Sequence, residues 1–264
     1  MTSEIVERVL RSSRYRDVDP ALLGRLAEEE LARARNVDDA VKRVKRRLHQ
    51  AVGAFRGSRR ASRLADAWNG DLEDPVFRDA CIEAMRGHAS TRERLNAIDA
   101  LYPAIWSVTG TPGSVLDLGC GLNPLTLPWM GISPVARYTA SDVDRRPLST
   151  VTAFLELVGQ AHRIEVRDLV SDPPEERADV ALLLKLVTTL DRQDPGAAAR
   201  LIDALDVRHV VLSFPLRSLG GGKRGMGRTY RARLDRLLEA SVRARTLTEV
   251  PVPDELVAVV GLDG

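Results

Sequence analysis

The sequence predicts an α/β protein, in which a mostly parallel sheet of about seven strands is preceded by an all-helical N-terminal domain. Three observations lead to this fold class. Residues 1–107 show apolar positions at helical spacing and almost no β-type alternation. After Pro112, short apolar runs of β-type residues alternate with helical or loop segments, as in a sheet covered on both faces. The last two runs are joined by the short link "PVPDE" (251–255), which favours an antiparallel pair at the end of the sheet.

Three helices are expected in the first part of the helical domain. The first begins near Ile5, and Pro20 lies near the start of the second, whose leucines form an apolar stripe. Residues that commonly cap helices occupy 36–39, before the third. The apolar face of this third helix consists of Val41, Val44, Leu48, Val52 and Phe55. More short helices follow, so we expect a helical domain at 1–107 and a sheet domain at 108–264.

The net charge of +2 conceals two strongly basic segments. Residues 33–63 contain eleven Lys or Arg against two acidic residues, a net charge of +9, and residues 217–236 have a net charge of +6. Basic segments of this kind usually bind polyanions such as nucleic acid, and a solvated charged face is the simpler alternative. The predicted RNA-binding residues are Lys42, Arg43, Lys45, Arg46, Arg47, Arg217, Lys223, Arg224 and Arg228.

The composition argues against several other classes of protein. No run of about 18 apolar residues is present, so no membrane span is expected. The charged N-terminus does not look like a secretion signal, because it lacks an apolar segment. Two cysteines and four histidines form no metal-binding or disulfide pattern, so we expect no metal site and a reduced, cytoplasmic protein. We also expect a monomer.

Seven apolar runs are expected to form the sheet, at 114–118, 135–140, 162–166, 178–184, 207–214, 244–250 and 255–260. In an open α/β sheet, ligands bind beyond the carboxyl ends of the strands. The first run ends in "SVLDLGCGLNP", which supplies Asp117, Gly119, Cys120 and Gly121. A dinucleotide-binding loop would have a third glycine where Pro124 stands, and the Gly-Lys-Ser/Thr of a triphosphate-binding loop is absent. A ligand without phosphates therefore fits better.

The next three strands each end in a residue suited to such a ligand. Asp142 ends the second strand and could accept hydrogen bonds from two ribose hydroxyls, and Asp168 follows the third and could accept one from an adenine amino group. Lys185 follows an apolar run, and because burying an unpaired ammonium is costly, we expect it to emerge at the mouth of the site. One strand-end Asp is often only a turn residue, but four such ends in succession predict an adenosine pocket. The adjoining Val143, Leu169 and Leu184 complete the predicted cofactor-binding set.

A glycine loop, a ribose-binding acid and an adenine-binding acid, without phosphate ligands, together describe the S-adenosylmethionine site of a Rossmann-like class I methyltransferase. Six further stretches carry a more specific pattern. They are "DAVKRVKRRLHQAVGAF" (39–55), "HASTRERL" (88–95), "LDLGCGLNPLTLPWMG" (116–131), "ASDVD" (140–144), "ADVALLLKLV" (178–187) and "FPLRSLGGGKRGM" (214–226). In these stretches the sequence resembles the aminoglycoside-resistance 16S rRNA (guanine(1405)-N7)-methyltransferases over nearly its whole length.

The resemblance implies a helical rRNA-binding domain attached to a catalytic domain that uses S-adenosylmethionine. The substrate would be N7 of one guanine in the decoding site of the assembled small (30S) ribosomal subunit, and methylation would confer resistance to 4,6-disubstituted deoxystreptamine aminoglycosides. The resemblance also places Arg94 at the cofactor site and makes Lys185 a lysine needed for activity. An ion pair on a helix surface is the alternative for Arg94. Val52, Leu216 and Arg217 depart from the family pattern, so no family contact is carried over to them.

Other functions stay open at this point. The protein could methylate another decoding-site nucleotide, such as a neighbouring adenine at N1, or it could be a non-catalytic rRNA-binding or assembly factor with a methyltransferase fold. A nicotinamide oxidoreductase is disfavoured by the missing glycine. For guanine N7 no general base is expected, because this nitrogen has a lone pair at neutral pH. Lys185 could then donate a hydrogen bond either to guanine O6 or to the methionine carboxylate.

Overall fold

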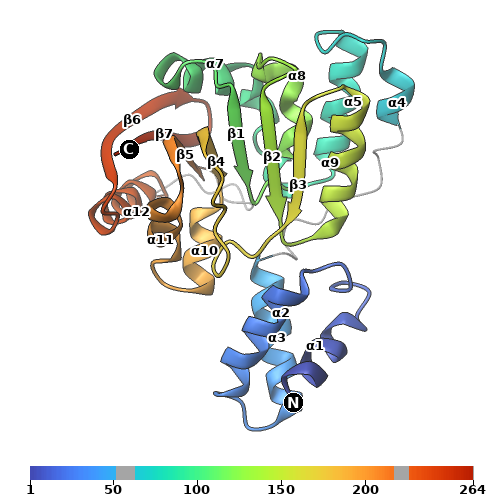
Figure 1. Cartoon of the computed structure of the whole chain (residues 1–264), viewed down its shortest axis with the longest axis vertical. Helices are drawn as coiled ribbons and strands as arrows, with labels where there is room; N and C mark the ends of the chain where they lie inside the picture. The colour runs from blue at the N-terminus through green and yellow to red at the C-terminus, as the bar shows by residue number, and fades with distance from the viewer. Residues whose placement is uncertain (52–62, 217–225, 264) are drawn as a thin grey trace.

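The computed structural model describes residues 1–51, 63–216 and 226–263. Figure 1 shows the strands side by side in the upper part of the molecule, with helices α1, α2 and α3 below them. The strands β1, β2 and β3 point with their carboxyl ends toward these three helices. The edge of the sheet at which ligands are expected is therefore also the edge that faces the N-terminal helices.

The sheet has seven strands in the order β3-β2-β1-β4-β5-β7-β6. Strands β1 to β5 pair in parallel, and β7 is antiparallel to both β5 and β6. This arrangement confirms the predicted fold class and the antiparallel pair at the end. The bounds are β1 (Ser114–Leu118), β2 (Arg137–Asp142), β3 (His162–Val166), β4 (Ala178–Leu184), β5 (Val207–Pro215), β6 (Ala244–Val252) and β7 (Glu255–Leu262).

The N-terminal helices are α1 (Thr2–Leu10), α2 (Pro20–Leu31) and α3 (Val37–Ala51). The side chain of Asp19 caps α2 by accepting a hydrogen bond from the Ala21 amide at 3.2 Å. The apolar faces of the three helices pack on one another in a core that includes Ile5, Leu22 and Leu48, all with no exposed surface. We call α1–α3 the N-terminal unit. Val52 and Phe55, expected on the face of α3, lie outside the described residues.

The helices that follow the N-terminal unit belong to the sheet instead. They are α4 (Arg63–Ala67), α5 (Pro75–Arg86), α6 (Ala89–Arg92), the short 3₁₀ helix η3 (Leu95–Ala97) and α7 (Ile98–Thr109). Phe77 and Tyr102 from this segment share a core with Val115 and Val180 of the sheet. In the sequence, the core of the N-terminal unit ends at Leu48, and Leu64 is the first residue of the core shared with the sheet, while the expected domain boundary at 107 and 108 stays a prediction. Helical spacing identifies a helix, but it does not show which surface the apolar face will pack against.

Each face of the sheet has its own core, because side chains alternate along the strands. In β4, Val180, Leu182 and Leu184 pack on the face with α5, α7 and α9, and Ala181 and Leu183 pack on the opposite face. The opposite face is covered by α10, α11 and α12. The remaining helices are η4 (Asn123–Thr126), α8 (Leu127–Met130), α9 (Arg145–Leu157), α10 (Val187–Gln193), α11 (Ala197–Ala204) and α12 (Met226–Ala240).

Candidate functional site

The switch point of the sheet lies at β1. Strand β1 pairs with β2 on one side and with β4 on the other, so the chain proceeds in opposite directions from it. The loops that follow these two strands therefore diverge and leave room for a ligand between them. We call the carboxyl ends of β1 to β5, with the loops that follow, the carboxyl edge.

The glycine loop after β1 requires its glycines. Gly119 and Gly121 have φ angles of +63° and +53°, a conformation that other residues rarely adopt. A Cβ atom on Gly121 would lie 2.7 Å from the imidazole ring of the buried His88, and one on Gly119 would lie 2.7 Å from Leu186. Between them, Cys120 is buried in the core, and its backbone amide donates to the Ser141 carbonyl at 2.9 Å. The loop thus brings backbone, without side chains, to the carboxyl edge.

Asp142 ties the end of β2 to this loop. Its Oδ2 accepts a hydrogen bond from the Gly121 amide at 2.9 Å, and its Oδ1 accepts one from the Asp144 amide at 3.0 Å. Burial raises the pKa of Asp142 above its ordinary value, although the amides oppose this shift. An ionised carboxylate has about four acceptor positions, so Asp142 can be oriented by these amides and still accept from a ligand.

Asp117, the acid that precedes the glycine loop, is buried within the fold. It is 1% exposed, and its Oδ2 accepts hydrogen bonds from the Tyr138 hydroxyl at 2.7 Å and from Asn123 Nδ2 at 3.0 Å. Burial raises its pKa to about 6, against the opposing effect of these donors. Asp117 therefore supports the glycine loop from within the fold, and its known contacts are to protein donors. A sequence motif locates such an acid at the site without showing which way its side chain points.

Replacing Asp117 by asparagine tests this burial. Because the folded-state pKa of about 6 exceeds the ordinary value of 3.8, ionising Asp117 opposes folding, and its contribution to the free energy of unfolding falls as the pH rises through this range. The amide cannot ionise and keeps an acceptor for Tyr138. The wild-type free energy of unfolding should therefore decrease relative to the variant by about 1–3 kcal/mol between about pH 4 and pH 7. Urea unfolding at both pH values measures this, and a difference that does not change with pH would contradict it.

Wild type and variant must be compared at each pH because the titration of His88 changes the free energy of unfolding in the opposite direction to that of Asp117. Burial, together with the nearby Lys185, lowers the pKa of His88 to about 4 from 6.5. A neutral His88 therefore contributes stability that is complete above about pH 6.5 and is lost as the pH falls toward about 4. This contribution is common to wild type and variant and cancels in their difference.

Arg94 lies in a buried network at the carboxyl edge. It is 3% exposed, and its guanidinium makes a bidentate ion pair with Glu255, with nitrogen–oxygen distances of 2.9 and 3.2 Å. It also donates to Asn123 Oδ1 at 2.9 Å and to the Ser213 hydroxyl at 3.4 Å. The alternative of an ion pair on a helix surface is therefore wrong. Through Asn123, which also donates to Asp117, the network reaches the base of the glycine loop.

Glu255 is a site residue that the sequence analysis missed. It begins β7, and because β7 is antiparallel to β5, its amino end lies beside the carboxyl end of β5. Residues at the carboxyl ends of the predicted strands do not include it. The signal that could have found Glu255 is the first residue of the strand that was correctly predicted to be antiparallel.

Lys185 follows directly after β4 with a φ angle of +60°. Its Nζ donates to Glu93 Oε2 at 2.8 Å, and only 7% of its side chain is exposed. Burial lowers the pKa of Lys185 below its ordinary value. The ion pair with Glu93 offsets the cost of covering this ammonium at the carboxyl edge, and its predicted place at the mouth of the site stays a prediction. A non-glycine residue with positive φ costs about 1–3 kcal/mol and is typically found at functional sites.

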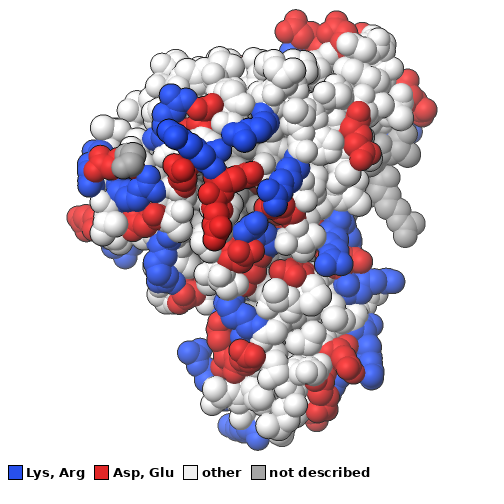
Figure 2. All heavy atoms as spheres, in the orientation of Figure 1, with Lys and Arg blue, Asp and Glu red and all other residues white. Residues whose placement is uncertain are grey.

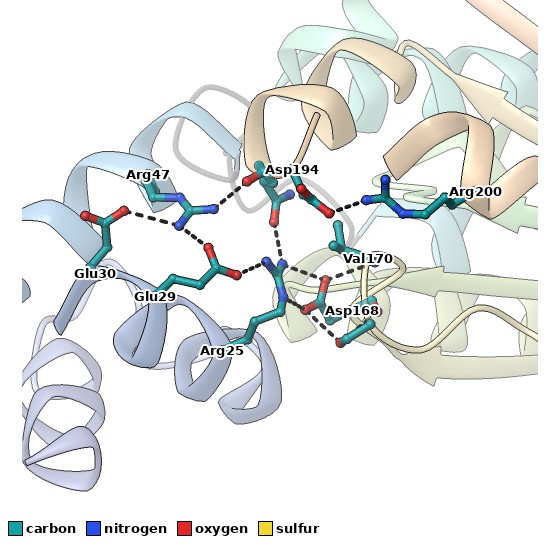
Figure 3. Close-up of polar contacts among 10 residues, drawn as sticks. Arg25, Glu29, Glu30, Arg47, Asp168, Val170, Asp194 and Arg200 are labelled. Atoms are coloured by element: carbon teal, nitrogen blue, oxygen red, sulfur yellow. Dashed lines mark hydrogen bonds and ion pairs between the residues drawn. The ribbon is translucent and has the colours of Figure 1, made fainter. Parts of the chain in front are cut away.

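Asp168 lies two residues beyond the end of β3 and is 3% exposed. Its carboxylate forms an ion pair with Arg25 of the N-terminal unit, at 2.7 Å (Figure 3). The predicted cofactor-binding set also includes three apolar residues. Leu184 is buried in the core on the α5, α7 and α9 face of the sheet and Leu169 in the core on the opposite face, and Val143 packs against the N-terminal unit. Loops from four successive parallel strands thus converge with Arg94 at one edge of the molecule.

Comparison with known proteins identifies the family. The model of the ribosomal RNA methyltransferase (FmrO) family matches residues 11–259. The chain belongs to this family of rRNA methyltransferases. It is 41% identical to the 16S rRNA (guanine(1405)-N(7))-methyltransferase of Frankia casuarinae, over 96% of this chain and 91% of the relative. It is 38% identical to the enzyme of the same name from Micromonospora echinospora, over 97% of this chain and 95% of the relative.

Solved structures of rRNA methyltransferases have the same fold. The 16S rRNA methyltransferase RmtF, in complex with S-adenosyl-L-homocysteine, matches with a TM-score of 0.84 and 32% identity, covering 99% of this chain and 98% of RmtF. The 16S rRNA methylase RmtB matches with a TM-score of 0.82 and 27% identity, covering 100% of this chain and 99% of RmtB. The match includes the N-terminal unit, because it covers essentially the whole chain in both cases.

The predicted RNA-binding residues of this rRNA methyltransferase differ in their surroundings. Lys42 and Arg46 are exposed, and Lys45 is half-buried. Arg43 donates to Asp39 at 3.2 Å and to Glu30 at 3.4 Å, so acidic neighbours offset its charge. Arg228, at the start of α12, is exposed, whereas Arg217, Lys223 and Arg224 lie outside the described residues. Figure 2 shows acidic and basic side chains intermixed on the visible face of the N-terminal unit.

Arg47 makes its described contacts within the protein, and its predicted role in RNA binding stays a prediction. Its side chain is 16% exposed and donates to Glu29 at 2.5 Å, to Glu30 at 3.2 Å and to the Gln193 carbonyl at 2.6 Å. It therefore joins α3 to α10 of the sheet domain. A count of basic residues in one segment cannot detect acidic partners that lie on another helix.

The described part of the chain meets the requirements of neither a metal site nor a membrane-spanning helix. Within the described ranges, no group of three or more His, Cys, Asp or Glu side chains is arranged to hold a metal ion. None of the helices that the structure describes is both long enough and apolar enough to cross a membrane.

Proposed function

We propose that this protein transfers a methyl group from S-adenosylmethionine to N7 of guanine 1405 in 16S rRNA, the reaction named for its relatives. The observation that carries the proposal is the joining of the glycine loop to Asp142 at the switch point, in a chain that matches those relatives over nearly its full length. Backbone without side chains and an oriented carboxylate suit an uncharged adenosine better than a pyrophosphate.

The residues at the carboxyl edge fit S-adenosylmethionine, which supplies an electrophilic methyl group when bound. Gly119 and Gly121 allow the positive φ angles of the loop and leave room for Leu186 and His88 packed against it, and the backbone of this loop would face the cofactor. Asp142 would accept hydrogen bonds from the ribose hydroxyls, and Asp168 would accept one from the adenine amino group. Arg94, whose guanidinium is occupied by Glu255 and Asn123, would order the wall of the site.

In this reaction the main task of the protein would be to position guanine N7 relative to the methyl group. Guanine N7 carries an available lone pair, so none of the acids at the carboxyl edge needs to remove a proton. Holding N7 in line with the methyl carbon and sulfur can supply much of the rate enhancement. A base that is paired in the rRNA must first be rotated out of its stack. Lys185 would then donate a hydrogen bond to guanine O6 or to the methionine carboxylate.

Lys185→Met should abolish methyl transfer, lowering the rate by at least about 100-fold, and should leave binding of S-adenosylhomocysteine within about threefold if Lys185 serves guanine. Methionine retains the length of the side chain and removes its charge. The measurement is primer extension on isolated small subunits incubated with each variant and S-adenosylmethionine, with calorimetry for the cofactor. Wild-type rates from the variant would exclude Lys185 from the reaction.

The substrate would be the assembled small subunit, bound through Lys42, Lys45, Arg46 and Arg228. RNA of A-form geometry hides its base edges in a deep groove, so such residues would contact phosphates and detect shape. Replacing both Lys45 and Arg46 by glutamate should weaken subunit binding by at least about tenfold and flatten its salt dependence. The control is Arg163→Glu, because Arg163 is exposed at the amino end of β3, away from the carboxyl edge. Equal affinities for the two variants would contradict this docking face.

The same primer extension tests the function as a whole. A new stop at guanine 1405 after borohydride reduction and aniline cleavage of the rRNA supports the proposal, and a stop at a neighbouring adenine without this treatment would support the alternative target. No modification of any nucleotide, together with subunit binding, would indicate an assembly factor. We further propose that the protein acts as a metal-independent monomer in the cytoplasm and confers resistance to kanamycin- and gentamicin-type drugs but not to apramycin.

A further inference from the structure

The N-terminal unit contacts the sheet domain at the loops that carry the proposed cofactor-binding acids. The Asp19 amide donates to the carbonyl of Val143, the residue after Asp142, at 2.8 Å. Val18, which is 1% exposed, pairs with Asp144 in an isolated antiparallel bridge. The loop after β2 is thus held by the glycine loop through Asp142 and by the N-terminal unit through its next two residues.

A second contact reaches the loop after β3. Arg25, on α2, donates from Nε to Asp168 Oδ2 at 2.7 Å and from Nη2 to Asp168 Oδ1 at 3.2 Å. The Arg25 side chain is 16% exposed and that of Asp168 is 2% exposed. A bidentate pair of this kind fixes both the position and the rotation of the carboxylate. Figure 3 shows the two side chains pointing toward each other from different parts of the chain.

Arg25 is itself held in place from two directions. Its Nη1 donates to Glu29 at 2.9 Å, and its Nη2 donates to Gln193 Oε1 at 3.0 Å. Glu29 in turn accepts from Arg47, whose other terminal nitrogen donates to the Gln193 carbonyl. These contacts close a ring between α2, α3 and α10, in which every guanidinium nitrogen of Arg25 has a partner. The orientation of Arg25 is therefore determined by the docking of the N-terminal unit.

Arg25 takes only some of the hydrogen-bond acceptor positions of the Asp168 carboxylate. An ionised carboxylate has about four acceptor positions. Arg25 occupies two, and the Val170 amide occupies another on Oδ1 at 3.2 Å. The remaining donor is the Ser171 hydroxyl, 3.1 Å from Oδ2, which can turn to the Asp168 carbonyl, 3.5 Å away. A ligand amino group can therefore replace the hydroxyl, and the position at which it must bind is set by Arg25.

We propose that Arg25 is a positioning residue for the cofactor site, which holds the Asp168 carboxylate in the orientation that recognises the adenine amino group. The N-terminal unit thereby contributes to cofactor recognition as well as to contact with rRNA. This inference rests on the proposed assignment of Asp168 to adenine. If Arg25 positions Asp168, its loss should reduce the preference for adenine over other bases more than it reduces the overall affinity for the cofactor.

The test compares two ligands that differ at one group. S-adenosylhomocysteine and S-inosylhomocysteine are titrated calorimetrically into the full chain, because the inosine analogue has a carbonyl oxygen in place of the amino group, with the adjacent N1 protonated. The wild type should prefer the adenosine ligand by at least about tenfold, since the carbonyl oxygen of the analogue would face the Asp168 carboxylate without a hydrogen atom between them. Arg25→Met should reduce this preference to about twofold or less. Arg25→Lys, which keeps the charge without the bidentate geometry, should give an intermediate preference.

The matched control is Arg47→Met. Arg47 has the same side-chain exposure as Arg25, 16%, and lies in the same ring, but its contacts are to Glu29, Glu30 and Gln193 and not to Asp168. A variant that merely loosens the docking would weaken both ligands together, so Arg47→Met should retain the wild-type preference. If Arg25→Met also retains it, the inference is overturned and the proposed function stands. A wild type without preference would refute the role of Asp168 and the inference with it, and a wild type that binds neither ligand would refute the proposed cofactor.

Discussion

Asp142→Ala should lower the affinity for S-adenosylhomocysteine by at least about 100-fold, because two hydrogen bonds to a charged acceptor are lost and each contributes about 1.5–3 kcal/mol. The substitution also removes the acceptor of the Gly121 amide. That amide lies in a loop whose glycine has a φ angle of +53°, so the loop loses a contact that supports an otherwise unfavourable conformation. Calorimetry with the purified protein measures the affinity directly.

Asp144→Ala is the matched control for this loss. Asp144 lies two residues further along the same loop, and its carboxylate accepts from the Arg146 amide at 3.1 Å, which caps α9. Loss of a helix cap costs about 1 kcal/mol of stability. We expect Asp144→Ala to unfold at lower urea concentration and to retain cofactor affinity within about tenfold. If both variants bound the ligand as the wild type does, Asp142 would have no part in the cofactor site.

The sequence predicted the sheet closely because its signals are local. The predicted runs at 114–118, 162–166 and 178–184 coincide with β1, β3 and β4. Buried parallel strands are continuous apolar runs, and polar residues mark where they end. The strand ends also predicted correctly that Asp142 and Asp168 lie at the carboxyl edge, because Asp142 is the last residue of β2 and Asp168 follows β3 by two residues.

The sequence could not predict which charged residues form pairs across the fold. Arg25 and Asp168 are separated by 143 residues, and Arg94 and Glu255 by 161. No spacing rule connects such positions, because their contact depends on how separate elements pack. The same limit explains why Lys185 was expected to be exposed, since its partner Glu93 lies on a segment whose packing was unknown. Partners of buried charges are thus the part of this site that only the structure supplies.

Glu255→Gln should lower the free energy of unfolding substantially. The substitution leaves the guanidinium of Arg94, which is 3% exposed, without its ion-pair partner. Breaking a buried ion pair by removing one partner typically costs about 3–5 kcal/mol, because the remaining charge stays desolvated. Glutamine retains most of the volume of the side chain, so the loss reports on charge and not on a cavity. Urea unfolding at about pH 7 should show a clearly lowered midpoint.

The pH dependence of this loss provides an internal check. Burial raises the pKa of Glu255, but Arg94 and Lys185 outweigh it and hold the pKa below its ordinary value of 4.5. A carboxylate with a lowered folded-state pKa contributes stability above the unfolded pKa and loses it as the pH falls. The gap between wild type and Glu255→Gln should therefore narrow below about pH 4.5.

A double variant, Arg94→Met with Glu255→Leu, separates the cost of an unpaired charge from the value of the pair. Replacing both partners by apolar residues removes the desolvated charge altogether, so the double variant should be more stable than Glu255→Gln alone. It should nevertheless fail to methylate the small subunit, because the wall that Arg94 orders next to Asn123 would be lost. A double variant that is both stable and fully active would mean that the pair maintains the fold without serving the site.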